Sequence, residues 1–318
     1  MSTKTQSNGN DTLREGLTRV LKHQDAGRLK EADTLLNLLM RDHGQVPVLV
    51  HYHGINLIQQ GNQEDGLARV EEALMDAPDD PVILCDYGAQ LANMGQLDDA
   101  LEQFQTAVEV APNYAIARSN LGAAQVLRKQ FKEAITNLKS AIEMDGRMLD
   151  AHTNLGTAYM ETNQFELAVD VLFKALSINP LDGVVHSRLS AALLRRERHD
   201  AAEHHARRAI ELLPEATEPY LHLGKALASA GRVNEAAEAL LHAASGPPVG
   251  LAALSRLIHL RKTSENTPEF DILQSSLARA ENLEPQGRTA LFFAAGIAFD
   301  DLGRYDEAFA HFKAANDL

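Results

Sequence analysis

Thirteen histidines and a single cysteine, Cys85, are the side chains of this 318-residue chain best suited to bind a metal or attack a substrate. Zinc sites place such ligands at short fixed spacings, for example His-Glu-x-x-His on one helix face. His51 and His53 lie two residues apart, and His204 and His205 are adjacent, so on helices the members of each pair point to different faces. We therefore expect no metal site.

Covalent catalysis by Cys85 would need an activating base beside the thiol. The repeat register described below places Ser119 and His51 in the flanking units, and a spectator thiol is the preferred interpretation. Carboxylate pairs such as Glu71-Glu72 and Asp98-Asp99 fall at helix surfaces or turns, where solvation explains them. The sequence predicts no catalytic residue and no cofactor in this chain, and whether it belongs to an enzyme stays open.

A different polar set recurs every 34 residues, where one position carries Asp, Asn, Asn, Arg and His in succession. The positions just before it and three residues after it are short or polar as well. The candidate partner-binding residues from these positions are Asp86, Ser119, Asn120, Thr153, Asn154, Thr157, Ser187, Arg188, His222 and Lys225. Recurrence at a fixed period implies repeated elements that position them.

The elements are visible in Leu149 to Asp182, which contains two amphipathic helical patterns. The patterns cover Ala151–Thr162 and Phe165–Ile178, and Asn179-Pro180 ends the second. Seven such units fill residues 13–250 without an insertion or deletion, and they begin at Leu13, Pro47, Pro81, Ala115, Leu149, Gly183 and Thr217. Neither helix of a unit can bury its apolar stripe alone, so the units must stack.

Small residues recur at fixed positions in these units. The first helix carries Gly54, Gly88, Gly122, Gly156, Ser190 and Gly224, and the second carries Ala32, Ala100, Ala134, Ala168, Ala202 and Ala236. We expect each Gly to face the Ala of its partner helix, so that the two backbones approach closely. The pattern resembles the tetratricopeptide repeat. That resemblance implies an all-α solenoid, a right-handed superhelix of antiparallel helix pairs.

In such a solenoid the first helices line the concave side, and the recurring polar positions point into its groove. Asn120 and Asn154 resemble the start of the asparagine ladder with which O-GlcNAc transferase repeats hold an extended peptide. An amide offers both a donor and an acceptor to a peptide backbone. The resemblance implies a protein or extended peptide as the partner.

A basic cluster lies in the sixth unit, between Arg195 and Arg208. Its arginines are Arg195, Arg196, Arg198, Arg207 and Arg208. One interpretation is a solvated face neutralised by Glu197, Asp200 and Glu203, and the other is a docking patch for an acidic partner or a further domain.

After Gly250 we expect the 34-residue spacing to be lost over a stretched helical pair, residues 251–288, and to return in a further unit, residues 289–318, truncated at its end. The segment FFAAGIAFDDLGRYDEAFAHFKAAN resembles the junction that precedes the catalytic domain of bacterial tetratricopeptide-containing sulfotransferases. The matching residues include Gly296, Asp300, Asp301, Leu302, Gly303, Tyr305, Phe309, His311, Phe312 and Asn316, whereas Ala294-Ala295 and Ile297 depart from the pattern. The resemblance implies a parent enzyme that uses 3′-phosphoadenosine 5′-phosphosulfate (PAPS), but this chain has no phosphate-binding loop of that family.

The formal net charge of −14 argues against nucleic acid and against an anionic membrane surface as partners. No apolar run approaches the ~18 residues of a membrane span, and a single cysteine indicates a reducing compartment. We expect a cytoplasmic protein with a disordered tail over residues 1–12. The favoured hypothesis is the substrate- or partner-recognition arm of a sulfotransferase. The alternatives are a free-standing adaptor and self-association through the end repeats.

Overall fold

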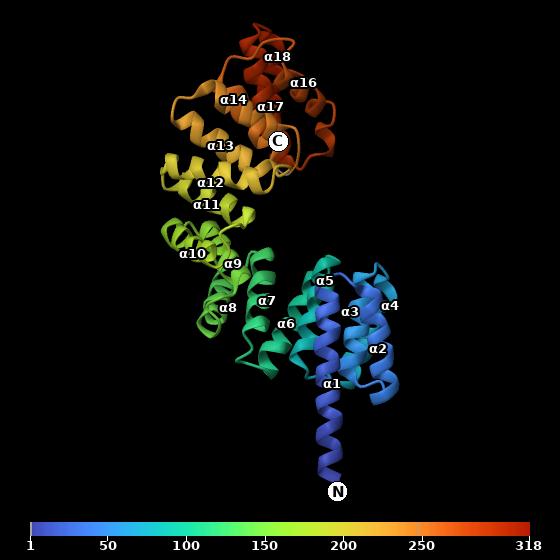
Figure 1. Cartoon of the computed structure of the whole chain (residues 1–318). Helices are drawn as coiled ribbons and strands as arrows, with labels where there is room; N and C mark the ends of the chain where they lie inside the picture. Colours follow the sequence, from blue (N-terminus) through green and yellow to red (C-terminus); the bar gives the residue numbers. More distant parts are fainter. Residues whose placement is uncertain (1, 248) are drawn as a thin grey trace. The chain divides into compact units, whose positions relative to one another are not determined.

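A computed structural model describes the backbone of residues 2–247 and 249–318 and the side chains of these ranges from Thr12 onward. Every regular element in these ranges is a helix, as the sequence predicts (Figure 1). The helices fall into two compact units, unit 1 (Met1–Asn154) and unit 2 (Leu155–Leu318). The boundary between the units lies within helix α9.

Unit 1 contains eight helices and the start of a ninth. They are α1 (Ser2–Asp25), α2 (Leu29–His43), α3 (Pro47–Gln59), α4 (Gln63–Asp76), α5 (Pro81–Asn93), α6 (Leu97–Val110), α7 (Ala115–Leu127), α8 (Phe131–Met144) and the first residues of α9 (Leu149–Glu161). From α1 to α8 each helix packs against the next in chain order (Figure 1). The sequence predicts a disordered tail for residues 1–12. Most side chains of this stretch lie outside the described residues, and its backbone from Ser2 onward is part of α1.

Unit 2 continues the same arrangement. Its helices after α9 are α10 (Phe165–Ile178), α11 (Gly183–Arg195), α12 (His199–Leu212), α13 (Thr217–Ser229), α14 (Val233–Ala244), α15 (Gly250–Leu260), α16 (Pro268–Leu277), the short 3-10 helix η1 (Ala280–Asn282), α17 (Pro285–Asp301) and α18 (Tyr305–Asn316). Helix α13 also contacts α11 on one side and α15 on the other. These first helices of successive pairs therefore form one continuous face within unit 2.

Local signals fix where the helices begin and turn. At the start of α5, the Asp80 carboxylate accepts hydrogen bonds from the backbone N–H groups of Val82 and Ile83, at 2.9 and 3.3 Å, and Pro81 takes the first helical position. The turn inside each pair contains one residue with positive φ. These residues recur every 34 positions, as Gly27, Gly61, Gly95, Lys129, Asn163, Glu197 and Gly231.

The small residues of the first helices allow close packing, although their main neighbours differ from our expectation. A Cβ added at Gly122 would lie 2.6 Å from Leu138 Cγ, and one at Gly224 would lie 2.6 Å from Leu240 Cγ. The Ala of the second helix contributes mainly its carbonyl oxygen, 3.4 Å away at Ala134. Gly122 and Gly224 therefore make room for a large side chain of the partner helix, which is fully buried at Leu138.

Candidate functional site

Two of the predicted contact residues, Asn120 on α7 and Asn154 on α9, lie at equivalent repeat positions in unit 1. Both are half-buried, and among the described residues neither side-chain amide has a hydrogen-bond partner. By contrast, Asn56 donates to the Leu29 carbonyl at 3.1 Å, and Asn137 donates to Gln125 at 3.0 Å. The amides of Asn120 and Asn154 thus keep donors and acceptors free for a ligand.

The next two positions of the same series lie in unit 2 and make internal contacts. Arg188 on α11 donates a hydrogen bond to the Thr157 hydroxyl on α9. Burial lowers the pKa of the Arg188 guanidinium, an effect opposed by Glu218 and Asp182. Ser187 Oγ lies 3.5 Å from His222 Nδ1, and both side chains are buried. These residues form part of the packed floor of the first-helix face.

Beside this floor, two pockets open along α11, α13 and α15. The first, of about 380 Å³, is lined by Met160, Ala191, Leu194, Arg195, His199, His222, Lys225, Ser229 and Arg256. The second, of about 580 Å³, is lined by Gly224, Lys225, Ala228, Leu240, Leu251, Ala252, Ser255, Arg256, His259, Leu260 and Ala290. Lys225 and Arg256 line both pockets, so the two are adjacent, and together we call them the unit 2 groove.

Positive side chains concentrate in this groove. Arg195, Lys225 and Arg256 line its first pocket, and neither pocket is lined by an Asp or Glu. Burial lowers the pKa of the Lys225 ammonium, the nearby charges of Arg256 and Arg195 lower it further, and Glu218 opposes them. Burial and the charge of Lys225 lower the pKa of His222 to about 4, so at neutral pH this imidazole is uncharged.

Sequence reasoning missed Arg256, although a signal for it existed. We expected the 34-residue spacing to be lost after Gly250, but α15 begins at Gly250, and Arg256 lies 34 positions after His222. The spacing of the helices continues into α15, but the small packing residues do not recur. Ile258, for example, occupies the position 34 residues after Gly224. Without the small residues as markers, Arg256 was not recognised as the next member of the polar series.

The arginine cluster from Arg195 to Arg208 divides between two surfaces. Arg196 and Arg198 both pair with Glu166, at 2.6 and 3.0 Å. Arg207 pairs with Glu203 at 2.8 Å, and Arg208 pairs with Glu211 at 2.6 Å. The neutralising carboxylates thus include Glu203 but otherwise differ from those expected. Only Arg195 lines the groove, and its guanidinium carbon also lies 4.5 Å from the centroid of the Phe165 ring, which lies outside the groove lining.

Cys85 is buried in an apolar cluster of unit 1, and the neighbouring Asp86 side chain is partly exposed. Burial raises the pKa of the Cys85 thiol to about 12, and the neighbouring Asp86 adds to the effect. His51 Nε2 lies 3.0 Å from Asp86 Oδ2, so the predicted contact residue Asp86 already faces a buried imidazole. A thiol with this pKa is protonated at neutral pH and is a poor nucleophile.

A histidine pair in unit 2 has a clear consequence for the pH dependence of stability. His186 Nδ1 and His205 Nδ1 lie 2.8 Å apart, and burial lowers the pKa of His205 to about 4, with His186 and His204 adding to the effect. In the unfolded chain an imidazole protonates near pH ~6.5. The unfolded state therefore binds more protons between these values, and stability falls as the pH drops from about 6.5 toward 4.

Replacing His205 with Leu should reduce this loss of stability. The expected result is a smaller fall in thermal midpoint between pH 7.5 and pH 4.5 for His205→Leu than for the unsubstituted chain, measured by circular dichroism. His259→Leu, at an exposed imidazole, is the matched control. An equal fall in all three proteins would show that the histidine pair does not carry the effect.

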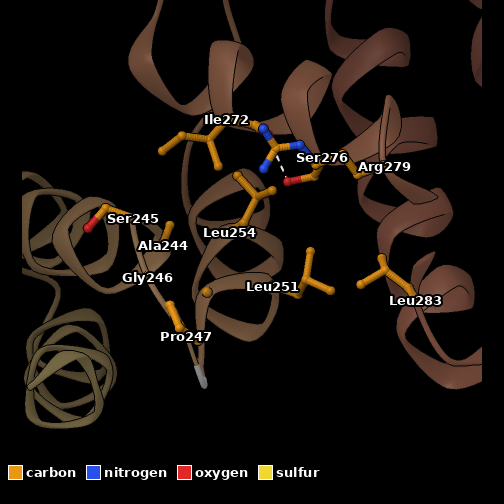
Figure 2. A pocket seen from close by; sticks show the side chains of 11 residues that line it. Ala244, Ser245, Gly246, Pro247, Leu251, Leu254, Ile272, Ser276, Arg279 and Leu283 are labelled. Atoms are coloured by element: carbon orange, nitrogen blue, oxygen red, sulfur yellow. Dashed lines mark hydrogen bonds between the residues drawn. The ribbon is translucent and has the colours of Figure 1, made fainter. Parts of the chain in front are cut away.

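A third pocket, of about 290 Å³, lies between α15, α16 and the segment that follows α14 (Figure 2). Figure 2 shows that its walls are mostly hydrocarbon, from Leu251, Leu254, Ile272 and Leu283. Ser245, Ser276 and Arg279 supply the few polar side-chain groups. This pocket lacks the convergent polar groups of the unit 2 groove, which is therefore the stronger candidate site.

The described part of the chain gives little support for a metal site or a membrane-spanning helix. No three His, Cys, Asp or Glu side chains gather there to hold a metal ion. No described helix is long and apolar enough to cross a membrane. At the end of unit 2, α18 exposes Tyr305 and Phe309, with 68% and 71% of their surfaces accessible, and the predicted self-association would use these side chains.

Comparison with known protein families identifies the repeats. Three family models, each described as a tetratricopeptide repeat, match residues 79–147, 125–193 and 188–249. Together they cover 171 of the 318 residues. The chain belongs to the tetratricopeptide-repeat family. No curated protein matches the chain.

Solved structures agree on the fold of this tetratricopeptide-repeat protein. A repeat protein from Parabacteroides merdae is 16% identical, with 79% of this chain and 98% of that chain covered and a TM-score of 0.54. The Cut9-Hcn1 hetero-tetramer of the APC/C is 13% identical, with 94% and 55% covered and a TM-score of 0.60. YrrB, a repeat protein described as having an unusual peptide-binding site, is 22% identical, with 59% and 96% covered and a TM-score of 0.49. The first two likenesses confirm the stack of paired helices.

None of these families or structures is a sulfotransferase. The resemblance of the segment around Gly296 to a sulfotransferase junction therefore receives no support. The general prediction of a tetratricopeptide-repeat protein is confirmed, and the specific link to that enzyme is not.

Proposed function

We propose that this chain is a protein-interaction scaffold that binds an extended segment of a partner protein along the unit 2 groove. The observation that carries the proposal is the continuity of two pockets through Lys225 and Arg256 on the contiguous helices α13 and α15. A groove lined by successive first helices suits an extended chain, because equivalent side chains recur along it. The adaptor alternative is thus favoured over the sulfotransferase arm.

Unit 1 offers a second set of contacts of the kind the sequence predicts. The amides of Asn120 and Asn154 can each donate to and accept from a peptide backbone. They carry no formal charge, so they would hold a backbone without selecting its side chains. In this proposal the groove of unit 2 binds its ligand selectively, and the asparagines of unit 1 are a separate set of general peptide contacts.

Blocking the groove tests the proposal directly. Short random peptides displayed on phage would be selected on the whole protein, and the affinity of the selected peptides measured by fluorescence anisotropy. Ala252 is exposed and lines the second pocket, so Ala252→Trp should fill the pocket without disturbing the core. We expect affinity to fall about tenfold or more, which corresponds to about 1.4 kcal/mol, with little change in thermal midpoint.

Ala278→Trp is the matched control, since Ala278 is exposed and lines none of the three pockets described above. The double variant Asn120→Ala/Asn154→Ala measures the contribution of unit 1 in the same assay. Its thermal midpoint should stay nearly unchanged, because the described structure gives these amides no partner to lose. Equal affinity of the selected peptides for the Ala252→Trp variant and the unsubstituted protein would reject the groove as their site.

A further inference from the structure

The unit 2 groove is positively charged in a chain whose formal net charge is −14. Arg195 from the end of α11, Lys225 from α13 and Arg256 from α15 converge on one pocket of about 380 Å³. Three cations from three helices in one pocket repel one another. No carboxylate lines the pocket, and Glu218 offsets only part of the effect at Lys225. A bound anion would relieve this repulsion, so the arrangement favours anion binding.

The contrast with the other arginines of the cluster, on α12 and in the turn before it, shows that this is not a general excess of arginine. There, Arg196, Arg198, Arg207 and Arg208 each pair with a carboxylate. Within the described residues, no carboxylate lies within ion-pair distance of Arg195, Lys225 or Arg256. Of the five arginines in the cluster, Arg195 alone has no carboxylate partner among the described residues, and it is the one that lines the groove.

Two further observations indicate a ligand in this place. The pKa of Lys225 is lowered by burial and by its two cationic neighbours, so a negative group beside it would relieve both effects. His199 lines the same pocket, and its Nδ1 is buried without a hydrogen-bond partner among the described residues. A buried polar atom without a partner costs free energy that a bound ligand can recover.

The adjoining pocket adds an apolar requirement. Its walls include Ala228, Leu240, Leu251 and Leu260, and it shares Lys225 and Arg256 with the cationic pocket. In an extended peptide, residues two positions apart project to the same side at a separation of about 7 Å. One peptide can therefore place an acidic side chain and an apolar side chain in neighbouring pockets.

We propose that the groove recognises an acidic segment of a partner protein, in which an Asp or Glu carboxylate binds among Arg195, Lys225 and Arg256 and an apolar side chain two residues away fills the adjoining pocket. Charge-assisted hydrogen bonds from the guanidinium and ammonium groups hold the carboxylate. This inference rests on the proposed function and specifies its ligand. Part of the binding is electrostatic, so affinity falls as salt is raised.

The test uses the whole chain and a fluorescein-labelled peptide, Gly-Ser-Gly-Glu-Glu-Leu-Leu-Gly-Ser-Gly. We expect it to bind at low salt, and we expect both the version with Gln in place of Glu and the version with Ser in place of Leu to bind about tenfold more weakly or worse. Lys225→Gln/Arg256→Gln should weaken the Glu peptide by the same factor without affecting the Gln peptide. The thermal midpoint of this variant should stay unchanged or rise, because repulsion between the half-buried Lys225 and its cationic neighbour is removed.

Arg207→Gln/Arg208→Gln removes the same net charge from the outer face of unit 2 and is the matched control. An equal loss of binding in this control would assign the effect to net charge and overturn the inference. So would equal affinity for the Glu and Gln peptides, or no binding of the Glu peptide at roughly 1 mM. Tighter binding of single-stranded DNA through Lys225 and Arg256 would also overturn it, by making the ligand a nucleic acid. In each case, sensitivity of the phage-selected peptides to Ala252→Trp would decide separately whether the groove binds peptides.

Discussion

Gly54→Ala should destabilise unit 1 by about 2–3 kcal/mol, although alanine is the better helix former by about 1 kcal/mol. Helices α3 and α4 cross where both carry glycine, and a Cβ on Gly54 would lie 2.7 Å from the Gly66 carbonyl oxygen and 3.0 Å from Val70 N. Backbone atoms cannot rotate away as a side chain can. The helices would have to separate, and the gain in helix propensity would be outweighed.

The measurement is the thermal midpoint by circular dichroism, together with hydrogen exchange of α3 and α4 to localise the loss, since repeat arrays need not unfold in two states. Gly122→Ala is the graded comparison. Its nearest obstacle is the Leu138 side chain, which can adjust, so its cost should be smaller. Gly146→Ala is the matched control, because the added Cβ would lie 3.8 Å from its nearest neighbour and should be tolerated. If Gly54→Ala is as stable as Gly146→Ala, close backbone contact at this crossing is not required.

The Gly54–Gly66 crossing also shows how far the sequence determined the fold. The recurrence of small residues predicted paired helices, because only close packing explains such a pattern in register. It did not show which atoms the glycines approach, since a Leu or Phe farther along the partner helix looks like any core residue. A second 34-residue signal went unused: Gly27, Gly61, Gly95 and Gly231 recur where the turns require positive φ. Lys129 and Glu197 take this conformation without glycine, which hid the regularity.

The candidate site was predictable in part, for a physical reason. Periodicity identified Arg188, His222 and Lys225 because equivalent positions on stacked first helices face the same way. Periodicity could not separate a neutral imidazole from a cation, since that distinction depends on burial and neighbouring charge, as at His222. Nor could it divide Arg195 from Arg196, which are adjacent in sequence but belong to different surfaces. Those distinctions arise from side-chain packing between repeats.

The loop after α15 is the other feature that periodicity left unexplained. Arg261 ends α15, and its Nη2 and Nε lie 2.7 and 3.2 Å from Glu269 Oε1 in the first turn of α16. The Thr263 N–H donates to Asp301 Oδ2 on α17 at 2.8 Å. The Glu269 side chain is only 3% exposed, whereas Arg261 is 40% exposed. A polar loop that looks unstructured in sequence is therefore held by two carboxylates.

Arg261→Met should cost unit 2 about 3 kcal/mol, because it leaves the Glu269 carboxylate buried without its cation. The favourable position of Glu269 at the α16 N-terminus offsets only part of this cost, typically ~0.3–1 kcal/mol. The double variant Arg261→Met/Glu269→Leu should recover most of the loss, since no charge then remains buried. Free energies of unfolding from urea denaturation, with hydrogen exchange of α15 and α16, provide the measurement.

Arg208→Met is the matched control for this cycle, because its partner Glu211 is 62% exposed and stays solvated when the arginine is removed. Exposed pairs contribute about 0–1 kcal/mol, so this variant should be nearly as stable as the unsubstituted chain. If the double variant is as unstable as Arg261→Met, packing of the arginine stem and not the charge holds the loop. Recovery in the double variant would instead show that the cost of Arg261→Met comes from the unpaired Glu269 carboxylate. The loop matters beyond its own stability, because α15, which it follows, also carries Arg256 into the groove.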